Sequence, residues 1–167
     1  GVAHNPESNM KLASGVAPVP QMLSRDVTVG LGTDGAASNN NLDMFQEMRS
    51  AALLHKVFAQ DPTVLPAYQV LELATTGGAR CLGLDQEIGQ LKPGYKADVI
   101  LVDLNKPHLS PRHDLAAHLV YAALASDVHT VIADGKILMQ AGQVLTLREK
   151  EIIEQVEERA RKLVAGL

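Results

Sequence analysis

His4 and Asp34 are the two residues whose types and surroundings best suit catalysis. His4 ends a short apolar run at residues 1–3, and Asp34 follows a β-prone run at residues 28–32. A histidine at the end of a parallel strand could polarise water or bind a metal ion. A carboxylate at the carboxyl end of such a strand could be a catalytic group. Each also has an ordinary interpretation: His4 could satisfy local backbone groups, and Asp34-Gly35 could simply form a turn. Residue type and spacing leave both interpretations open.

The other polar candidates favour structural roles. The segment 36–41 is small and polar and precedes a predicted helix, so we expect one of its Ser or Asn side chains to cap that helix. The single cysteine, Cys81, has small and apolar neighbours and is predicted to be buried rather than nucleophilic. No pair of the remaining histidines has the i, i+4 spacing of a zinc-binding helix, so we interpret them as structural or surface residues. They are His55, His108, His113, His118 and His129.

The elements that would position these residues divide into two regions. Up to about residue 82, short apolar strands alternate with helical patterns, which is the signature of an α/β fold. From residue 83 the pattern predicts a strand, a short helix, a β-meander around Asp134-Gly135 and an amphipathic terminal helix with a solvated charged face. The predicted helices cover residues 18–24, 42–58, 66–80, 115–124 and 148–163, and the later strands cover 97–104, 130–133, 136–139 and 143–147.

Composition excludes several classes of protein. The chain has 167 residues, 46% hydrophobic and 20% charged, with a formal net charge of −4, so it lacks the basic character of a nucleic-acid binder. No apolar run approaches the roughly 20 residues of a membrane-spanning helix. One cysteine cannot form an internal disulfide, and a reducing cytoplasm is the simplest location. A whole (β/α)₈ barrel takes roughly 200 residues or more, so we expect part of a larger enzyme.

Two long motifs resemble the amidohydrolase superfamily, in the branch of methylthioadenosine/S-adenosylhomocysteine deaminases and their chlorohydrolase relatives. They are VAHNPESNMKLASG at residues 2–15 and GLGTDGAASNN at residues 30–40. IGQLKPGYKADV at residues 88–99 resembles the family's passage from barrel to β-sandwich, and VIADGK at residues 131–136 resembles its terminal hairpin. The resemblance covers nearly the whole chain in register and matches only the C-terminal part of the family.

This resemblance implies the C-terminal portion of a TIM-like (β/α)₈ barrel plus part of a β-sandwich. Residues 1–82 would form the last barrel strands and helices, and residues 83–167 the partial sandwich with its C-terminal helix. His4 would end the sixth barrel strand, residues 11–13 would form the seventh, and Asp34 would end the eighth. The family's His-x-His pair, its fifth-strand histidine and its glutamate proton shuttle have no counterpart, because the matching region begins after them. In agreement, no His-x-His occurs in the chain.

The resemblance also implies a mechanism. A divalent metal ion, expected to be zinc, would lower the pKa of water, with Asp34 as metal ligand and proton acceptor. His4 would orient the hydroxide, Ser38 would line the substrate pocket, and attack at C6 of an adenine ring would release ammonia. The expected substrate is a purine nucleoside, S-adenosylhomocysteine or methylthioadenosine. A catalytic zinc takes three protein ligands, and Asp34 is one, so we expect the isolated chain to be inactive.

Two alternatives stay open at this stage. Relatives with similar motifs deaminate guanine or cytosine, or remove chloride from triazines. A non-catalytic assembly module is the other possibility, because a partial barrel would expose an unpaired strand edge and apolar surface. We therefore expect a homo-oligomer or pairing with the missing N-terminal half, and neither a nucleic-acid nor a membrane partner.

Overall fold

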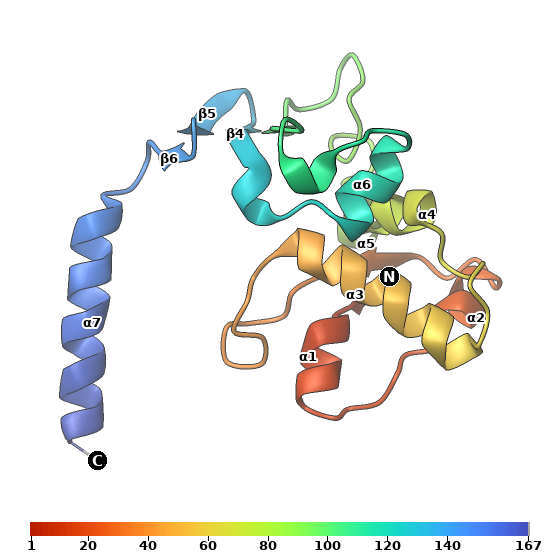
Figure 1. Cartoon of the computed structure of the whole chain (residues 1–167), viewed down its shortest axis with the longest axis horizontal. Coiled ribbons are helices and arrows are strands. Elements are labelled where there is room, and N and C mark those ends of the chain that lie inside the picture. The colour runs from red at the N-terminus through yellow and green to blue at the C-terminus, as the bar shows by residue number, and fades with distance from the viewer. Residues whose placement is uncertain (167) are drawn as a thin grey trace.

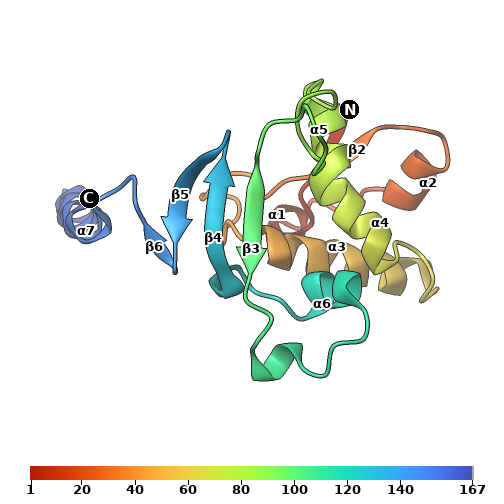
Figure 2. The same cartoon turned by 90° about the horizontal axis from the view of Figure 1, so that it is seen from above.

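Two small sheets organise the chain, and helices surround the first of them (Figures 1 and 2). The structure is a computed structural model and describes residues 1–166, so Leu167, the last residue of the second expected unit, lies outside the described residues. The first sheet has two parallel strands, and the second has four antiparallel strands. This mixture of helices, parallel strands and an antiparallel meander agrees with the predicted α/β class.

The parallel sheet pairs β1 (Val2–His4) with β2 (Val29–Leu31), and each strand lies in one of the two predicted apolar runs. Ala3 lies opposite Gly30, and His4 lies opposite Leu31. The carboxyl ends of both strands therefore meet at one edge. A Cβ atom on Gly30 would lie 2.8 Å from the Cα of Gly78, so only glycine lets the neighbouring helix come this close to β2.

The implied seventh barrel strand at residues 11–13 is absent from the described structure, and that expectation was wrong. Helix α1 (Pro6–Lys11) begins directly after β1, with Pro6 at its first position, where proline is favoured. Ala13 then adopts a left-handed backbone with φ of 53°, which is incompatible with a strand. β1 and β2 consequently pair with each other without a strand between them. Since neighbouring strands of a (β/α)₈ barrel are consecutive, β1 would be the seventh strand if β2 is the eighth, so the expectation that His4 ends the sixth strand was wrong too.

The predicted capping of the helix after β2 was also wrong. The N-cap of helix α3 (Met44–Ala59) is Asp43, whose carboxylate accepts hydrogen bonds from the backbone nitrogens of Phe45 (2.8 Å) and Gln46 (3.4 Å). The preceding Ser and Asn residues lie too early in the chain to occupy the cap position. Asp43 is as good a cap as either residue type, so the sequence alone did not separate them.

The predicted helix over residues 66–80 is one helical run with a π-helical turn inside it. That turn lies where Gly77 packs against the backbone oxygen of Val29, too close for a side chain. The tertiary contact with β2 thus accompanies a local departure from α-helical geometry. The helical elements of this region are α2 (Val19–Leu23), α4 (Ala67–Glu72), the π-helical η1 (Leu73–Gly77) and α5 (Gly78–Leu82).

One hydrophobic core joins residues from both expected units. Helix α6 (Leu115–Tyr121) belongs to the second unit by sequence but packs against α3 and α4 of the first. Asp114 caps α6 by accepting a hydrogen bond from the Ala117 backbone nitrogen at 3.1 Å. The buried residues of this core are Val19, Val29, Phe45, Met48, Ala51, Ala52, Leu65, Val70, Leu73, Leu109, Val120 and Ala123.

The second sheet is the predicted meander, with strand order β3-β4-β5-β6. Asp134 and Gly135 both have positive φ, the conformation that a two-residue type I′ hairpin turn requires. Ala141 and Gly142 have the same property at the next turn. The elements are β3 (Val99–Val102), β4 (Val128–Ala133), β5 (Lys136–Gln140) and β6 (Gln143–Val144), with short 3₁₀ turns η2 (Pro107–Leu109) and η3 (Ala125–Asp127).

The terminal helix α7 (Glu149–Ala165) lies apart from the rest of the chain, beyond β6 (Figures 1 and 2). None of its residues is buried, and the apolar stripe that includes Ile152, Ile153 and Val156 is exposed. Within residues 1–166, no helix combines the length and hydrophobicity needed to cross a membrane.

Candidate active site

Asp34 lies just beyond the carboxyl end of β2 and is held by two hydrogen bonds. Its Oδ2 accepts from the Ser8 hydroxyl at 2.7 Å, and its Oδ1 accepts from the Gly35 backbone nitrogen at 2.7 Å. These bonds, with a smaller contribution from the half-buried Ser38 hydroxyl, lower the pKa of Asp34 below its ordinary value. Asp34 is exposed and has a left-handed φ of 58°. The result is a fixed, ionised carboxylate, suited to binding a cation.

His4 ends β1 at the same edge, but its hydrogen-bond partner is His55 of α3. The two Nε2 atoms are 3.0 Å apart, and both side chains are buried, with 2% and 1% exposure. Burial, and secondarily the charge of His55, lower the pKa of His4 to about 4. Burial also lowers the pKa of His55. Both imidazoles are therefore neutral near pH 7.

Sequence reasoning assigned His55 a structural role and missed its contact with His4. The available signal was its place in the apolar stripe of α3, where it follows Met48, Ala51 and Ala52 at helical spacing. A histidine in such a stripe must be buried. Its partner lies 51 residues away in the sequence and is visible only once the chain is folded.

Glu47, which is fully buried on α3, connects the start of α1, which follows β1, to the loop that follows β2. Its Oε1 accepts from the Asn39 side-chain amide at 2.6 Å, and its Oε2 accepts from the Glu7 backbone nitrogen at 3.3 Å. Burial raises the pKa of Glu47 to about 7. The Ser50 hydroxyl binds the Glu7 carboxylate at 2.8 Å. Asn39, one of the expected caps, instead helps to fix the loop after β2.

The described residues do not contain a full metal site. Across residues 1–166, no three His, Cys, Asp or Glu side chains converge as a ligand set. Asp34 is suited to be one ligand, because its carboxylate is ionised, exposed and fixed by hydrogen bonds. This carboxylate fits one ligand position of a divalent-metal site.

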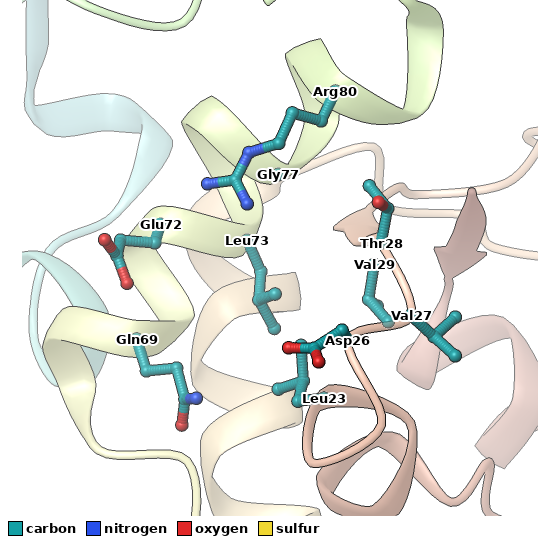
Figure 3. A pocket seen from close by; sticks show the side chains of 10 residues that line it. All are labelled: Leu23, Asp26, Val27, Thr28, Val29, Gln69, Glu72, Leu73, Gly77 and Arg80. Atoms are coloured by element: carbon teal, nitrogen blue, oxygen red, sulfur yellow. The ribbon is translucent and has the colours of Figure 1, made fainter.

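A cavity of about 360 Å³ lies at the opposite, amino end of β2 (Figure 3). Asp26, Thr28, Glu72 and Arg80 contribute polar groups to its lining, and Leu73 closes its apolar side. The strand direction separates this cavity from Asp34 and His4. In α/β barrels the chemistry takes place at the carboxyl ends of the strands, so this cavity is not the candidate site.

Comparison with known proteins identifies the family. The Amidohydrolase family profile matches residues 1–138. The chain is 60% identical over 164 residues to a 5-methylthioadenosine/S-adenosylhomocysteine deaminase from Syntrophomonas wolfei, and 60% identical over 164 residues to a 5'-deoxyadenosine deaminase from Methanosarcina mazei. Each match covers 98% of this chain and 38% of the relative. The chain therefore spans less than half the length of these proteins.

Solved structures agree with the sequence relatives. An adenosine deaminase from Xanthomonas campestris with bound zinc superimposes with a TM-score of 0.95 at 38% identity, covering 98% of this chain and 37% of that one. An atrazine chlorohydrolase from Arthrobacter aurescens complexed with zinc gives a TM-score of 0.86 at 29% identity, covering 95% and 35%. The resemblance carried by the two long motifs is thus confirmed, and the chain belongs to the amidohydrolase family.

Proposed function

We propose that this chain is the C-terminal part of a zinc-dependent aminohydrolase acting on the adenine ring of S-adenosylhomocysteine or methylthioadenosine. The observation that carries the proposal is Asp34, a fixed and ionised carboxylate at the carboxyl end of β2. It occurs in a chain 60% identical to named deaminases of this type. In this proposal residues 1–82 are the last part of a (β/α)₈ barrel, residues 83–167 are part of a β-sandwich, and the enzyme works in the cytoplasm.

The chain's own residues would divide the chemistry as follows. Asp34 would hold the metal ion through its carboxylate and accept a proton from water. His4 would hydrogen-bond to the oxygen that adds to C6 of adenine, and Ser38 would contact the substrate beside Asp34. The metal ion, when bound, supplies a lowered pKa for water near neutral pH. One water proton ends on the leaving nitrogen and the other on ring nitrogen N1, so ammonia leaves as the C6–N bond breaks and a carbonyl forms at C6.

The isolated chain should be inactive. A catalytic zinc normally takes three protein ligands, and the described residues offer no such group. The other ligands would come from the part of the enzyme that the relatives have and this chain does not span. Its partners would be a purine nucleoside and the remainder of the barrel, or a second copy of the chain.

A segment-exchange chimera tests the proposal directly. Residues 1–167 replace the matching 38% of the Syntrophomonas wolfei deaminase. We expect the chimera to bind stoichiometric zinc and to deaminate S-adenosylhomocysteine, followed by the absorbance change of the purine ring. Asp34→Asn in the chimera should abolish both, and the isolated chain should show neither. A folded, zinc-loaded chimera without adenine deamination, or turnover by the isolated chain, would contradict the proposal.

Triazine dechlorination is the second candidate reaction. The solved chlorohydrolase is 29% identical to this chain, against 60% for the named deaminases, so deamination is favoured. Assaying the chimera on adenine nucleosides, guanine, cytosine and a chlorotriazine separates these activities, although the upstream half would influence substrate choice. An exchange into the chlorohydrolase as well as the deaminase controls for that influence.

A further inference from the structure

Both oxygens of Asp34 are held by groups that lead back to one buried carboxylate, that of Glu47. Asp34 Oδ2 accepts from the Ser8 hydroxyl, and Oδ1 accepts from the Gly35 backbone nitrogen, each at 2.7 Å. Ser8 lies on α1, whereas Gly35 lies on the loop after β2. The orientation of the Asp34 carboxylate therefore depends on how these two segments are placed relative to each other.

Helix α1 depends on Glu47 for its placement. With six residues it is too short to be stable alone, and its N-cap residue, Asn5, makes no side-chain capping bond. The N–H of Glu7, in the first turn, instead donates to Oε2 of Glu47 at 3.3 Å. Ser8 is the next residue, so this bond holds the backbone beside the hydroxyl that binds Asp34.

The loop after β2 reaches the same carboxylate through Asn39. The Asn39 side-chain amide donates to Oε1 of Glu47 at 2.6 Å, and both side chains are buried. The Asn39 backbone nitrogen also donates to the Gly35 backbone oxygen at 2.8 Å. The contacts form a closed ring that runs from Asp34 through Ser8, Glu7, Glu47, Asn39 and Gly35 back to Asp34.

A second connection between α1 and this loop lies on the surface. Lys11 Nζ donates to the Asn40 side-chain oxygen at 2.6 Å and to the Ala37 backbone oxygen at 3.0 Å. Lys11 and Asn40 are both exposed, so water replaces these bonds at little cost when they are removed. Cutting the buried ring instead leaves a buried polar group without a partner. The buried ring should therefore control the geometry.

We propose that Glu47 is a positioning residue that orients the Asp34 carboxylate by joining α1 to the loop after β2. Glu47 touches neither metal nor substrate and acts through Ser8 and Gly35. Groups that orient a metal ligand change metal affinity about ten- to hundredfold when they are removed. The consequence for metal binding rests on the proposed deaminase function, whereas the fixed orientation of Asp34 does not.

Two variants of the segment-exchange chimera each cut the ring at one point. Asn39→Ala removes the bond to Oε1, and Glu47→Gln leaves one acceptor oxygen for two donors. Each should weaken zinc binding about ten- to hundredfold in competition with a chelator. The double variant should bind zinc about as weakly as the single ones, because the second cut falls in a ring that is already open. Asn40→Ala, which alters the neighbouring exposed asparagine, should bind zinc like the parent.

Hydrogen exchange gives a readout that needs neither metal nor turnover. In the metal-free chimera, both ring variants should exchange the Gly35 amide several times faster than the parent, because that amide donates to Asp34. Amides in the middle of α3 should keep the parent's rates, and Asn40→Ala should change neither. A merely structural role for Glu47 would instead speed exchange throughout α3.

The outcomes separate this role from the proposed function. Unchanged Gly35 exchange in a folded ring variant, exchange that rises equally along α3, or additive losses of zinc affinity in the double variant would overturn the proposal. If the parent chimera binds no zinc, the proposed function fails, and exchange at Gly35 still decides whether Glu47 orients Asp34.

Discussion

Ser8 fixes one oxygen of Asp34, and this single hydroxyl should matter for metal binding. Its Oγ donates to Asp34 Oδ2 at 2.7 Å, and Ser8 itself is buried. In the chimera, Ser8→Ala should weaken zinc affinity by about ten- to hundredfold, because the carboxylate loses the group that orients it. Competition with a chelator measures this.

Ser24→Ala is the matched control, since the exposed Ser24 hydroxyl bonds only to the Gln21 backbone oxygen. Equal zinc affinity in Ser8→Ala and the parent would show that Gly35 alone is sufficient to hold Asp34.

At the scale of single residues, sequence reasoning found Asp34 and His4 but not the side chains that hold them. Polar residues directly after β-prone runs are recognisable because strand and turn patterns are local. The partners Ser8 and His55 lie 26 and 51 residues from the atoms they contact. No local pattern encodes such contacts, although the apolar stripe of α3 indicates that His55 is buried.

Through Glu47, helix α3 holds together α1 and the loop after β2, and this makes stability depend on pH. The pKa of Glu47 is about 7 in the folded chain against an ordinary value of 4.5, so between those values the folded state binds more protons than the unfolded state. Stability should therefore fall as the pH rises through this window, by up to about 3 kcal/mol. Thermal unfolding of the chimera at pH 5.5 and pH 8 measures the change.

Glu47→Gln removes the titrating group and keeps one acceptor oxygen, for the Asn39 amide, but its amide nitrogen cannot accept from the Glu7 backbone nitrogen. This variant should lose the component of pH dependence due to Glu47. Glu149→Gln, at the exposed start of α7, should behave like the parent. A parent and a Glu47→Gln variant with identical pH dependence would mean that Glu47 is already ionised in the folded chain.

At the scale of elements, most strands and helices could be predicted, and the exceptions have a tertiary cause. The hairpin at Asp134-Gly135 is encoded by its own two residues. The π-helical turn in the run after Pro66 is not, because it accompanies the approach of Gly77 to Val29. The prediction of a strand at residues 11–13 was wrong because Pro6 starts a helix. The prediction gave the family resemblance more weight than this local helix signal.

On the scale of the whole molecule, two of the exposed apolar surfaces are suited to association. An apolar groove of about 660 Å³ lies where α3 and α5 face β3, with Met44, Leu91 and Ile100 in its lining. The stripe of α7 is the second place. Contiguous exposed apolar surface drives association. The isolated chain should therefore form oligomers, which sedimentation velocity would detect.

Charges placed in the α7 stripe should reduce this association. The double variant I152E/V156E changes the net charge by −2 and should shift the isolated chain toward monomer. Lys150→Glu gives the same charge change outside the stripe and should leave the oligomers in place. A parent chain that sediments as a single monomeric species would contradict the prediction.

The contact between Gly30 and the Gly77-Gly78 backbone sets the spacing between β2 and the helix that follows Pro66. Because main chain meets main chain there, the spacing between β2 and the helix is independent of side-chain size. Core residues elsewhere in that helix can change volume without moving the strand. The position of Asp34, four residues beyond the contact, therefore depends on the backbone contact between these three glycines and not on the volume of the core side chains.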